Sequence, residues 1–444
     1  IAVLPITYKV LATTLLIMLE KKFDERTDGE QIGGQKGFSV LDGLVLVQKL
    51  LEHAEDYGKE GILAFVDFEA AFNSPSFGAI WKVLAEEGFP EDVICLLERL
   101  YSDQRGRTRG QMEGKWFSIS RGTKEGDPLS ARIFALLISH MMRRLRDTWR
   151  SKGYGYNLVG EVVMDCEYAD DVLLVAKTRK QMEEMLGDLA NLSREYGLRV
   201  NWKKTKTKLM DMQGKVRKPI MVAWPGGDKE VPFVQEVEYL GRYFAVGGGG
   251  DEAVRRRLQK AWKVFWECKR ALCNKAVPFV KRYTYLCRTV GAVATYGLES
   301  VELSRQQLNM LRTARRQMMR KMRSRRWGAV SDRVNYDVWV KMETQRAEEA
   351  ARNLGVTGRW EESVAMGKFK WAGHMVRRGS ERRTQRVIMA QETQKRASAG
   401  HPKTRWHNII EELLGRGWQE TAEDREWWRY FSNEVPNWIA TILD

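Results

Sequence analysis

Cysteine and histidine are scarce in this chain of 444 residues, which holds five of each. No two cysteines form a Cys-x-x-Cys pair, so neither a zinc knuckle nor a disulfide framework is expected, and the compartment is predicted to be reducing and intracellular. Long apolar runs are missing too. The stretch Val10–Leu19 is flanked by charged residues and is too short to span a bilayer, so it predicts a packed helix and no membrane partner.

Acidic residues are also fewer than basic ones. The chain has 58 Asp and Glu against 74 Lys and Arg, which gives a net charge of +16 and a pI near 9.5. A basic balance of this size favours a polyanionic partner, nucleic acid before membrane. The chain is 43% hydrophobic and long enough for two or three domains with their own cores. It begins at Ile1 and not at methionine, as a fragment or a processed product would.

Strand and helix signals alternate over the first 250 residues. The apolar run Ile62–Asp67 ends in an acid, which predicts a buried strand that presents a carboxylate at its end. Pro128 opens a long apolar helix pattern that continues through Leu145. The run Gly247–Gly250 is the clearest linker in the sequence, because glycine restricts neither backbone angle. We therefore place a domain boundary there.

The pattern after Asp251 is almost wholly helical. Between Ser304 and Trp327 there are nine basic residues and no acidic one. Repulsion along such a helix is unfavourable by itself, so a phosphate-facing helix is preferred to the alternative of a solvated face. The predicted nucleic-acid contacts are Arg312, Arg315, Arg316, Arg320 and Arg323.

The last segment, residues 331–444, is rich in tryptophan and basic in patches such as Lys368–Arg378 and Lys403–Trp406. Basic residues interleaved with aromatic ones suit single-stranded nucleic acid, through phosphate contact and base stacking. The alternative, that the tryptophans pack a small helical core, is favoured for most of them because Trp usually lies largely buried.

Two adjacent carboxylates, Asp170 and Asp171, occupy the tip of a predicted β-hairpin with apolar flanks. Paired aspartates are common in turns, but a buried charge must be paired or must coordinate a metal. Asp67 offers a third carboxylate that could converge on the same sheet edge. Such a set suits Mg²⁺, and two ions ~4 Å apart can activate a hydroxyl and stabilise the leaving oxygen of a phosphoryl displacement. The site is a nucleotidyl-transfer candidate.

Five motifs follow one another in order along the first 241 residues. They are Phe65–Phe72, Gly122–Ser130, Tyr168–Asp171, Gly197–Asn201 with Lys204–Lys206, and Tyr239–Gly241. In this order they resemble the successive motifs of reverse transcriptases, in the variant found in non-LTR (LINE-like) retrotransposons. Gln31–Ser39 resembles the fingers segment of that family, the basic helix its thumb, and the two Trp-containing basic stretches its C-terminal tail.

The resemblance implies an α+β, right-hand polymerase fold. Fingers and palm would occupy residues 1–250, a helical thumb residues 251–330, and a basic, Trp-rich helical region residues 331–444. It also implies an enzyme that copies an RNA template into DNA, adding dNTPs to a DNA primer with two Mg²⁺ ions, for which Mn²⁺ can substitute. A nuclear location would follow from the family's way of life and not from a targeting signal.

The resemblance assigns roles residue by residue. Asp67 and Asp170 would bridge the two ions, Asp171 would support them, and the backbone carbonyl of Phe68 would complete the coordination. Phe72 stands where the family carries an aromatic gate that excludes the ribose 2′-hydroxyl. The alternative for Phe72 is an ordinary core aromatic.

The nucleotide-binding positions are less regular. Gly126 would let the backbone approach the incoming nucleotide, and Lys204, with three lysines competing for the role, would protonate the departing pyrophosphate. Glu125 replaces the usual Gln, and its carboxylate would repel a triphosphate unless it is protonated or paired. Arg is common where this chain has Phe38, and only Lys36 remains nearby as a point charge.

Two hypotheses of different class follow, and an active RNA-directed DNA polymerase from a mobile element is preferred because all three aspartates are present. The second is a binding protein that keeps the fold and its basic groove but has lost efficient catalysis, which Leu4, Phe38 and Glu125 would favour. A third, closer alternative is a reverse transcriptase of the group II intron type. The resemblance of the C-terminal tail argues against it.

Overall fold

The computed structural model describes residues 4–108, 114–124, 126–203, 205–225, 227–247, 250–323, 335–352, 358–378, 386–387 and 405–443. Two compact units share the chain. The first comprises Ile1–Leu240 and Arg382–Ala399, and the second Gly241–Glu381 and Gly400–Asp444. The division between the units falls after Leu240, whereas the glycine-rich run predicted a boundary at Gly247–Gly250. The segments expected to form the thumb and the C-terminal region both fall largely in the second unit.

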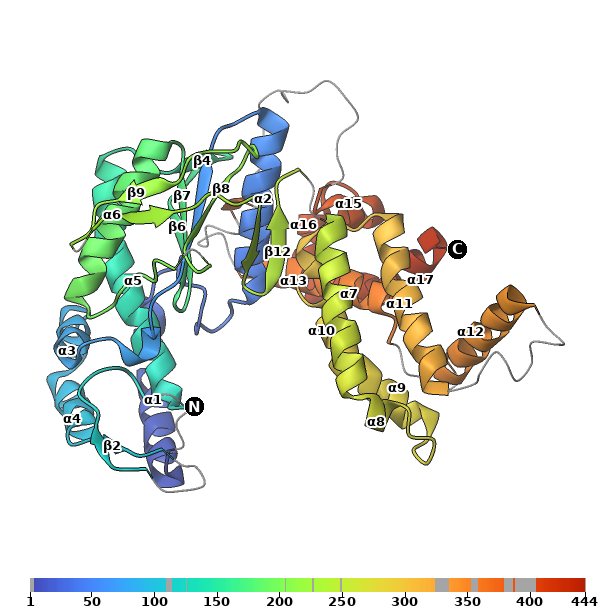
Figure 1. The fold of residues 1–444 in the computed structure, drawn as a ribbon, viewed down its shortest axis with the longest axis horizontal. Coiled ribbons are helices and arrows are strands. Elements are labelled where there is room, and N and C mark those ends of the chain that lie inside the picture. The colour runs from blue at the N-terminus through green and yellow to red at the C-terminus, as the bar shows by residue number, and fades with distance from the viewer. Residues whose placement is uncertain are drawn as a thin grey trace. The chain divides into compact units, whose positions relative to one another are not determined.

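A four-stranded antiparallel sheet forms the centre of the first unit, in the order β6, β7, β1, β8 (Figure 1). The four strands are β6 (Asp165–Tyr168), β7 (Asp171–Ala176), β1 (Ile62–Val66) and β8 (Lys208–Asp211). The other strands of this unit are β2 (Arg105–Gly106), β3 (Phe117–Ser118), β4 (Tyr156–Leu158), β5 (Glu161–Val163), β9 (Ile220–Val222), β10 (Lys229–Val231) and β11 (Glu236–Tyr239).

Helices cover both faces of this sheet. They are α1 (Ile6–Arg26), α2 (Val40–Tyr57), α3 (Phe77–Glu86), α4 (Glu91–Tyr101), α5 (Pro128–Ser151) and α6 (Arg179–Glu195), with a 3-10 turn η1 (Ala71–Asn73). Alternate residues of β1, such as Ala64 and Val66, join the core that α5 and α6 complete. Phe65 points to the other face and contacts the ring of Tyr239. Figure 1 shows α6 and α2 on opposite sides of the strands.

Capping residues mark where the helices of the first unit begin. Asp127 caps α5 by accepting a hydrogen bond from the Leu129 amide at 2.9 Å, and Pro128 occupies the first turn, as predicted. The apolar run Val10–Leu19 lies within α1, which packs on α5. Among the described residues, no helix is long and apolar enough to cross a membrane.

The second unit is helical apart from β12 (Arg242–Ala245) in its described part. Its helical segments are α7 (Gly250–Glu267), α8 (Lys269–Leu272), α9 (Phe279–Leu286), η2 (Cys287–Gly291), α10 (Ala292–Thr295), η3 (Leu298–Ser300), α11 (Arg305–Arg323), α12 (Tyr336–Arg352), α13 (Trp360–Val376), α15 (Asn408–Leu414), α16 (Trp418–Glu423) and α17 (Arg425–Leu443). Five tryptophans of the last segment are buried in it, as favoured from the sequence: Trp360, Trp371, Trp406, Trp418 and Trp428. The α+β class predicted for the chain is thus confirmed.

Candidate active site

Strand register brings the three predicted carboxylates to one end of the sheet. Asp67 follows the last residue of β1, and Asp171 is the first residue of β7. These strands pair antiparallel with Val66 opposite Val172, so Asp67 and Asp171 continue side by side beyond that pair. Asp170 lies in the tight turn between β6 and β7, which is the predicted hairpin.

The paired carboxylates of the hairpin feel both burial and neighbouring charge. Burial, then the charges of Asp170 and Asp67, raise the pKa of Asp171 to about 6. Burial also raises the pKa of Asp170, with Asp67 acting in the same direction, while Lys206 opposes the rise in both groups. A concentration of negative charge of this kind is what a bound cation relieves.

Asp67 has two partners that the sequence analysis left without a role. The side-chain amide of Asn201 donates a hydrogen bond of 2.9 Å to Asp67 Oδ2, and the Asn201 backbone amide donates one of 2.8 Å to the Asp67 carbonyl. Lys206 Nζ lies 3.7 Å from the same Oδ2. Both residues belong to motifs identified in the sequence, Gly197–Asn201 and Lys204–Lys206, and these motifs could have indicated a role beside Asp67. They fix the orientation of the Asp67 carboxylate.

The donor set fits a hard divalent cation. It consists of oxygens from three aspartates, with the backbone of Phe68 next to Asp67 and bridged to Val200. Within the described residues, no three His, Cys, Asp or Glu side chains already form a metal cluster. Mg²⁺ usually keeps several waters and binds through one or two carboxylates plus substrate phosphates, so a closed protein cage is not what it requires.

Phe72 links two of the predicted motifs. Its ring stacks on Phe134 of α5 with centroids 4.4 Å apart, and the side chain is half-buried. Its carbonyl accepts hydrogen bonds from the amide and hydroxyl of Thr123, at 2.7 and 3.1 Å. The aromatic is therefore packed against Phe134 without being fully buried, which leaves both the gate and the core interpretations in place.

The segment before α5 carries a lysine that sequence reasoning missed. Lys124 Nζ donates to the Leu100 carbonyl at 2.6 Å and lies 4.1 and 4.6 Å from the ring centroids of Tyr8 and Tyr101. Burial lowers the pKa of this lysine to about 8. Gly126 follows with a φ of +80°, in the left-handed region that favours glycine.

Only some of the other predicted nucleotide contacts belong to the described residues. Lys36 is exposed. Glu125 and Lys204 lie outside the described residues, so their predicted roles stay predictions. The roles of Gly126, Phe72 and Lys36 in binding the nucleotide stay predictions as well.

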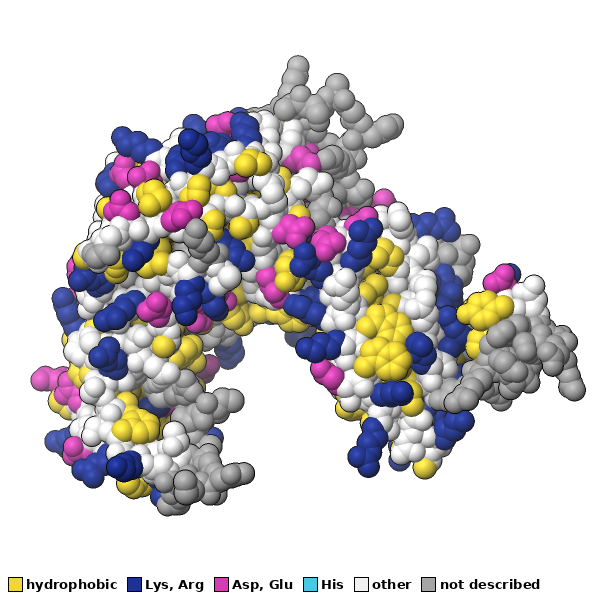
Figure 2. Space-filling model, viewed as in Figure 1, with side chains coloured by type: hydrophobic (Ala, Val, Ile, Leu, Met, Phe, Trp, Pro, Cys, Tyr) yellow, Lys and Arg dark blue, Asp and Glu magenta, His cyan; other side chains and the backbone are white. Residues whose placement is uncertain are grey.

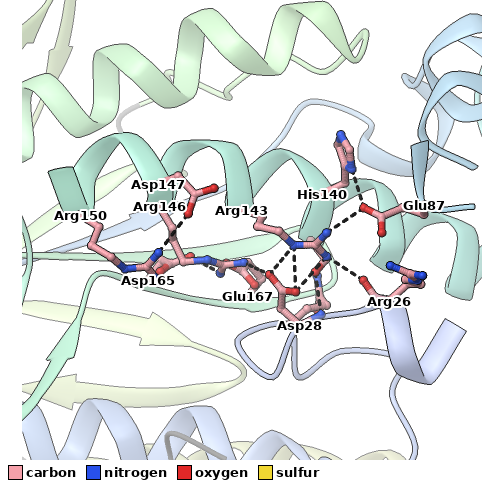
Figure 3. A network of polar contacts seen from close by, with 12 residues as sticks. Arg26, Asp28, Glu87, His140, Arg143, Arg146, Asp147, Arg150, Asp165 and Glu167 are labelled. Atoms are coloured by element: carbon pink, nitrogen blue, oxygen red, sulfur yellow. Dashed lines mark hydrogen bonds and ion pairs between the residues drawn. The ribbon is translucent and has the colours of Figure 1, made fainter. Parts of the chain in front are cut away.

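A buried polar network supports the hairpin from the side of α5 (Figure 3). Arg146 of α5 pairs with Asp165 at 2.8 Å and with Glu167 at 3.3 Å, and also with Asp28. Arg143, one turn earlier, pairs with Asp28 at 2.9 Å. Burial, then the charge of Asp165, raise the pKa of Glu167 well above its usual range. The network ties β6 to α5 just before the paired aspartates.

The basic helix α11 is arranged differently from the prediction. Arg315 is fully buried, with Nη2 2.7 Å from Glu348 Oε1 of α12 and 3.5 Å from Glu361 Oε1 of α13. Arg316 Nε lies 3.0 Å from the same Glu348 oxygen. Arg315 therefore cannot contact phosphate in this structure, because α12 and α13 supply the acids that α11 lacks. The side chains of Arg320 and Arg323 also reach α12, at Thr344 and Glu343, and Arg312 is half-buried.

Comparison with known proteins decides the family. Residues 1–244, more than half of the chain, match the family described as "Reverse transcriptase (RNA-dependent DNA polymerase)". The chain belongs to this reverse transcriptase family. The matched region contains the whole sheet with its three aspartates, and reverse transcriptases as a family use divalent metal ions.

The relatives of this reverse transcriptase are retrotransposon proteins. It is 27% identical over 225 residues to the "Retrovirus-related Pol polyprotein from type-2 retrotransposable element R2DM" of Drosophila melanogaster, covering 48% of this chain and 21% of that protein. The R2 polyprotein of Popillia japonica is 27% identical over 267 residues, 56% of this chain and 36% of its own. The chain thus spans about a third or less of these relatives. These relatives are proteins of retrotransposable elements, the class of element to which the sequence motifs point.

Among solved structures, apo telomerase from Candida tropicalis aligns with 85% of this chain and 61% of its own at 9% identity, with a TM-score of 0.39. The family assignment rests on the match to residues 1–244 and on the sequence relatives.

Proposed function

We propose that this protein is the RNA-directed DNA polymerase of a non-LTR retrotransposon, which adds dNTPs to the 3′-hydroxyl of a DNA primer along an RNA template. The observation that carries the proposal is the convergence of Asp67, Asp170 and Asp171 at one end of the sheet, within the region that matches the family.

In this proposal Asp67 and Asp170 hold two Mg²⁺ ions, Asp171 supports them and the Phe68 carbonyl completes the coordination. Mn²⁺ can substitute. When bound, such ions lower the pKa of the attacking hydroxyl and stabilise the charge on the leaving oxygen. The chain's own contribution is orientation, because Asn201 and Lys206 hold one oxygen of Asp67 in a defined direction.

The incoming dNTP is proposed to lie against Phe72 and Gly126. The exposed part of Phe72 would meet the sugar, and the exposed, side-chain-free backbone at Gly126 would meet the nucleotide. Lys36 and Glu125 are proposed neighbours of the triphosphate, and Lys204 a proposed proton donor to the pyrophosphate. Phe72 is held by the stack on Phe134, so its ring cannot easily rotate away.

A different surface of the second unit replaces Arg315 as the proposed contact with template and primer. Trp262 and Trp266, one turn apart on α7, stack with centroids 6.1 Å apart. Lys269 Nζ lies 5.4 Å and Lys321 Nζ 5.3 Å from the Trp266 centroid. Figure 2 shows a hydrophobic patch bordered by Lys and Arg side chains in the region of α7. Aromatic rings among cations suit unpaired bases and their phosphates.

Primer extension on an RNA template with dNTPs and Mg²⁺ tests the proposal. The wild-type chain should extend the primer, and Asp170→Asn should abolish extension while retaining the fold and the affinity for template–primer. Asp228→Asn, at an exposed position in the first unit, is the matched control and should extend normally. Extension by Asp170→Asn near the wild-type level would refute the metal assignment. No extension by the wild type, with tight binding retained, would favour the binding protein that has lost catalysis.

A further inference from the structure

The segment before α2 runs alongside the catalytic hairpin. We call residues 28–33 the strap. Its first residue, Asp28, is held by Arg143 and Arg146 of α5 (Figure 3). The strap then pairs with the edge of β6, where the Glu167 amide donates to the Glu30 carbonyl at 2.9 Å and the Ile32 amide donates to the Glu167 carbonyl at 2.7 Å. It is in effect one more, parallel element of the sheet.

Gln31 sits in the middle of the strap with no exposed surface. Its Oε1 accepts a hydrogen bond of 2.9 Å from the Ala169 amide and another of 2.9 Å from the Gly33 amide. Its Nε2 donates a longer hydrogen bond, of 3.4 Å, to the Ala169 carbonyl. One carboxamide thus engages both backbone groups of the residue that precedes Asp170.

Ala169 needs such support. Its φ is +55°, in the left-handed region where a residue with a Cβ is strained. That conformation turns the chain between β6 and β7 and determines where Asp170 points. A strained turn persists only when its surroundings hold it, and Gln31 supplies hydrogen bonds at this point.

Gly33 makes the close approach possible. A Cβ at this position would lie 2.3 Å from the Ala169 amide nitrogen, which no packing adjustment of a side chain could relieve because the clashing atom is backbone. The strap is therefore shaped to lie directly against the turn, and glycine is required where the two backbones meet.

We propose that Gln31 is a positioning residue for the reaction, holding the Ala169 turn so that Asp170 and Asp171 face Asp67. This inference rests on the proposed polymerase function. A glutamine suits the position because it can accept from one backbone group and donate to the other, whereas leucine can do neither and a carboxylate would add charge beside the aspartates.

The first test is Gln31→Leu in the full chain, with Gln213→Leu as the matched control. Gln213 is likewise a glutamine whose side chain bonds the backbone, donating to the carbonyls of Ala54 and Lys59, but it lies away from the turn. Gln31→Leu should lower kcat of primer extension by about tenfold to a hundredfold, the scale expected when reacting groups are displaced by about 1 Å. The KM for dNTP and the affinity for template–primer should stay within about twofold. Gln213→Leu should leave kcat unchanged.

The second test does not depend on activity. Hydrogen–deuterium exchange of the peptide that contains Ala169 should be faster by about tenfold or more in Gln31→Leu, because its amide loses its acceptor. The control Gln213→Leu should exchange like the wild type there. If Gln31→Leu does not fold, Gln31→Asn, which keeps the carboxamide but shortens it by one methylene, serves in both tests.

The outcomes separate the two proposals. Faster exchange with lower kcat supports the positioning role. Unchanged exchange overturns it whatever the activity, and so does faster exchange with kcat within twofold of the wild type. If the wild-type chain extends no primer, the polymerase proposal fails. The exchange measurement then still decides whether Gln31 holds the turn. Titration of the wild type and of Gln31→Leu with Mn²⁺ decides whether holding the turn also positions the aspartates. Equal Mn²⁺ affinities of the two proteins would overturn the inference.

Discussion

Replacing Arg315 with methionine should destabilise the second unit and leave nucleic-acid binding by the remaining folded protein intact. The guanidinium is buried between Glu348 and Glu361, which are themselves almost fully buried. Methionine fills much of the volume but leaves these carboxylates without their main counter-charge. Removing one partner of a buried ion pair costs about 3–5 kcal/mol.

The pKa of Glu348 gives a second measure of this interaction. Burial alone would raise the pKa, but the charges of Arg315 and Arg316 lower it from 4.5 to about 2. At about 1.4 kcal/mol per pKa unit this is about 3 kcal/mol, shared between the two arginines. Because the pKa is lower in the folded state, the stabilisation is present at neutral pH and is lost as the pH falls from about 4.5 towards 2. The lower end of the range, about 3 kcal/mol, is therefore expected.

Urea unfolding followed by tryptophan fluorescence measures the effect, since many of the buried tryptophans lie in the second unit. Arg305→Gln, at an exposed position on the same helix, is the control and should change stability by less than about 0.5 kcal/mol. The double variant Arg315→Met, Glu348→Met should recover part of the loss. The reasoning is refuted if Arg315→Met costs less than about 1 kcal/mol while the salt dependence of template–primer binding becomes flatter, because Arg315 would then face phosphate after all.

Three further predictions follow from the same structure. Phe72→Val should lower the preference for dNTP over ribonucleotide by about tenfold or more in single-nucleotide incorporation, and unchanged sugar selectivity would return Phe72 to the core. Because burial and two neighbouring aspartates raise the pKa of Asp171 to about 6 from 3.8, Asp171→Asn should stabilise the metal-free protein at pH 7 by about 1–3 kcal/mol in urea. That gain should vanish below about pH 4, and a destabilised variant at pH 7 would contradict the mutual repulsion. Trp266→Ala should weaken binding of single-stranded RNA by about 1–3 kcal/mol in fluorescence titration, whereas Trp427→Ala, at another exposed tryptophan, should not; equal losses would mean that α7 carries no specific surface.

The sequence predicted the catalytic part of the sheet because its signals are local. Ile62–Asp67 is apolar up to its last residue, so a buried strand with a carboxylate at its end was the natural interpretation, and β1 is buried throughout. The hairpin at Asp170 could be recognised from the apolar runs on either side of it. Only the pairing of β1 with β7 was needed to bring the carboxylates together.

The thumb-like helix could not be interpreted in the same way, because its partners are remote in sequence. Glu348 lies 33 residues beyond Arg315, on another helix. The sequence of α11 itself gives no indication that Glu348 packs against Arg315 and neutralises its charge. The boundary between the two units also depends on contacts that are remote in sequence. Arg257 of α7 donates a hydrogen bond to the Gly241 carbonyl, and Arg242 donates one to the Ser300 hydroxyl. The chain therefore enters the second unit before the glycine run at which the sequence placed the boundary.

The shared arginine beneath the hairpin has a consequence for how the chain tolerates substitution. Arg146 pairs with carboxylates from two stretches of chain, the strap and β6, and both Asp165 and Glu167 lie entirely out of contact with solvent. Replacing Arg146 by a neutral residue would leave these buried carboxyl groups without their shared partner, at a cost of about 3–5 kcal/mol. Loss of stability and loss of activity should therefore go together when this position is changed, because one guanidinium serves both the fold and the turn that carries the aspartates.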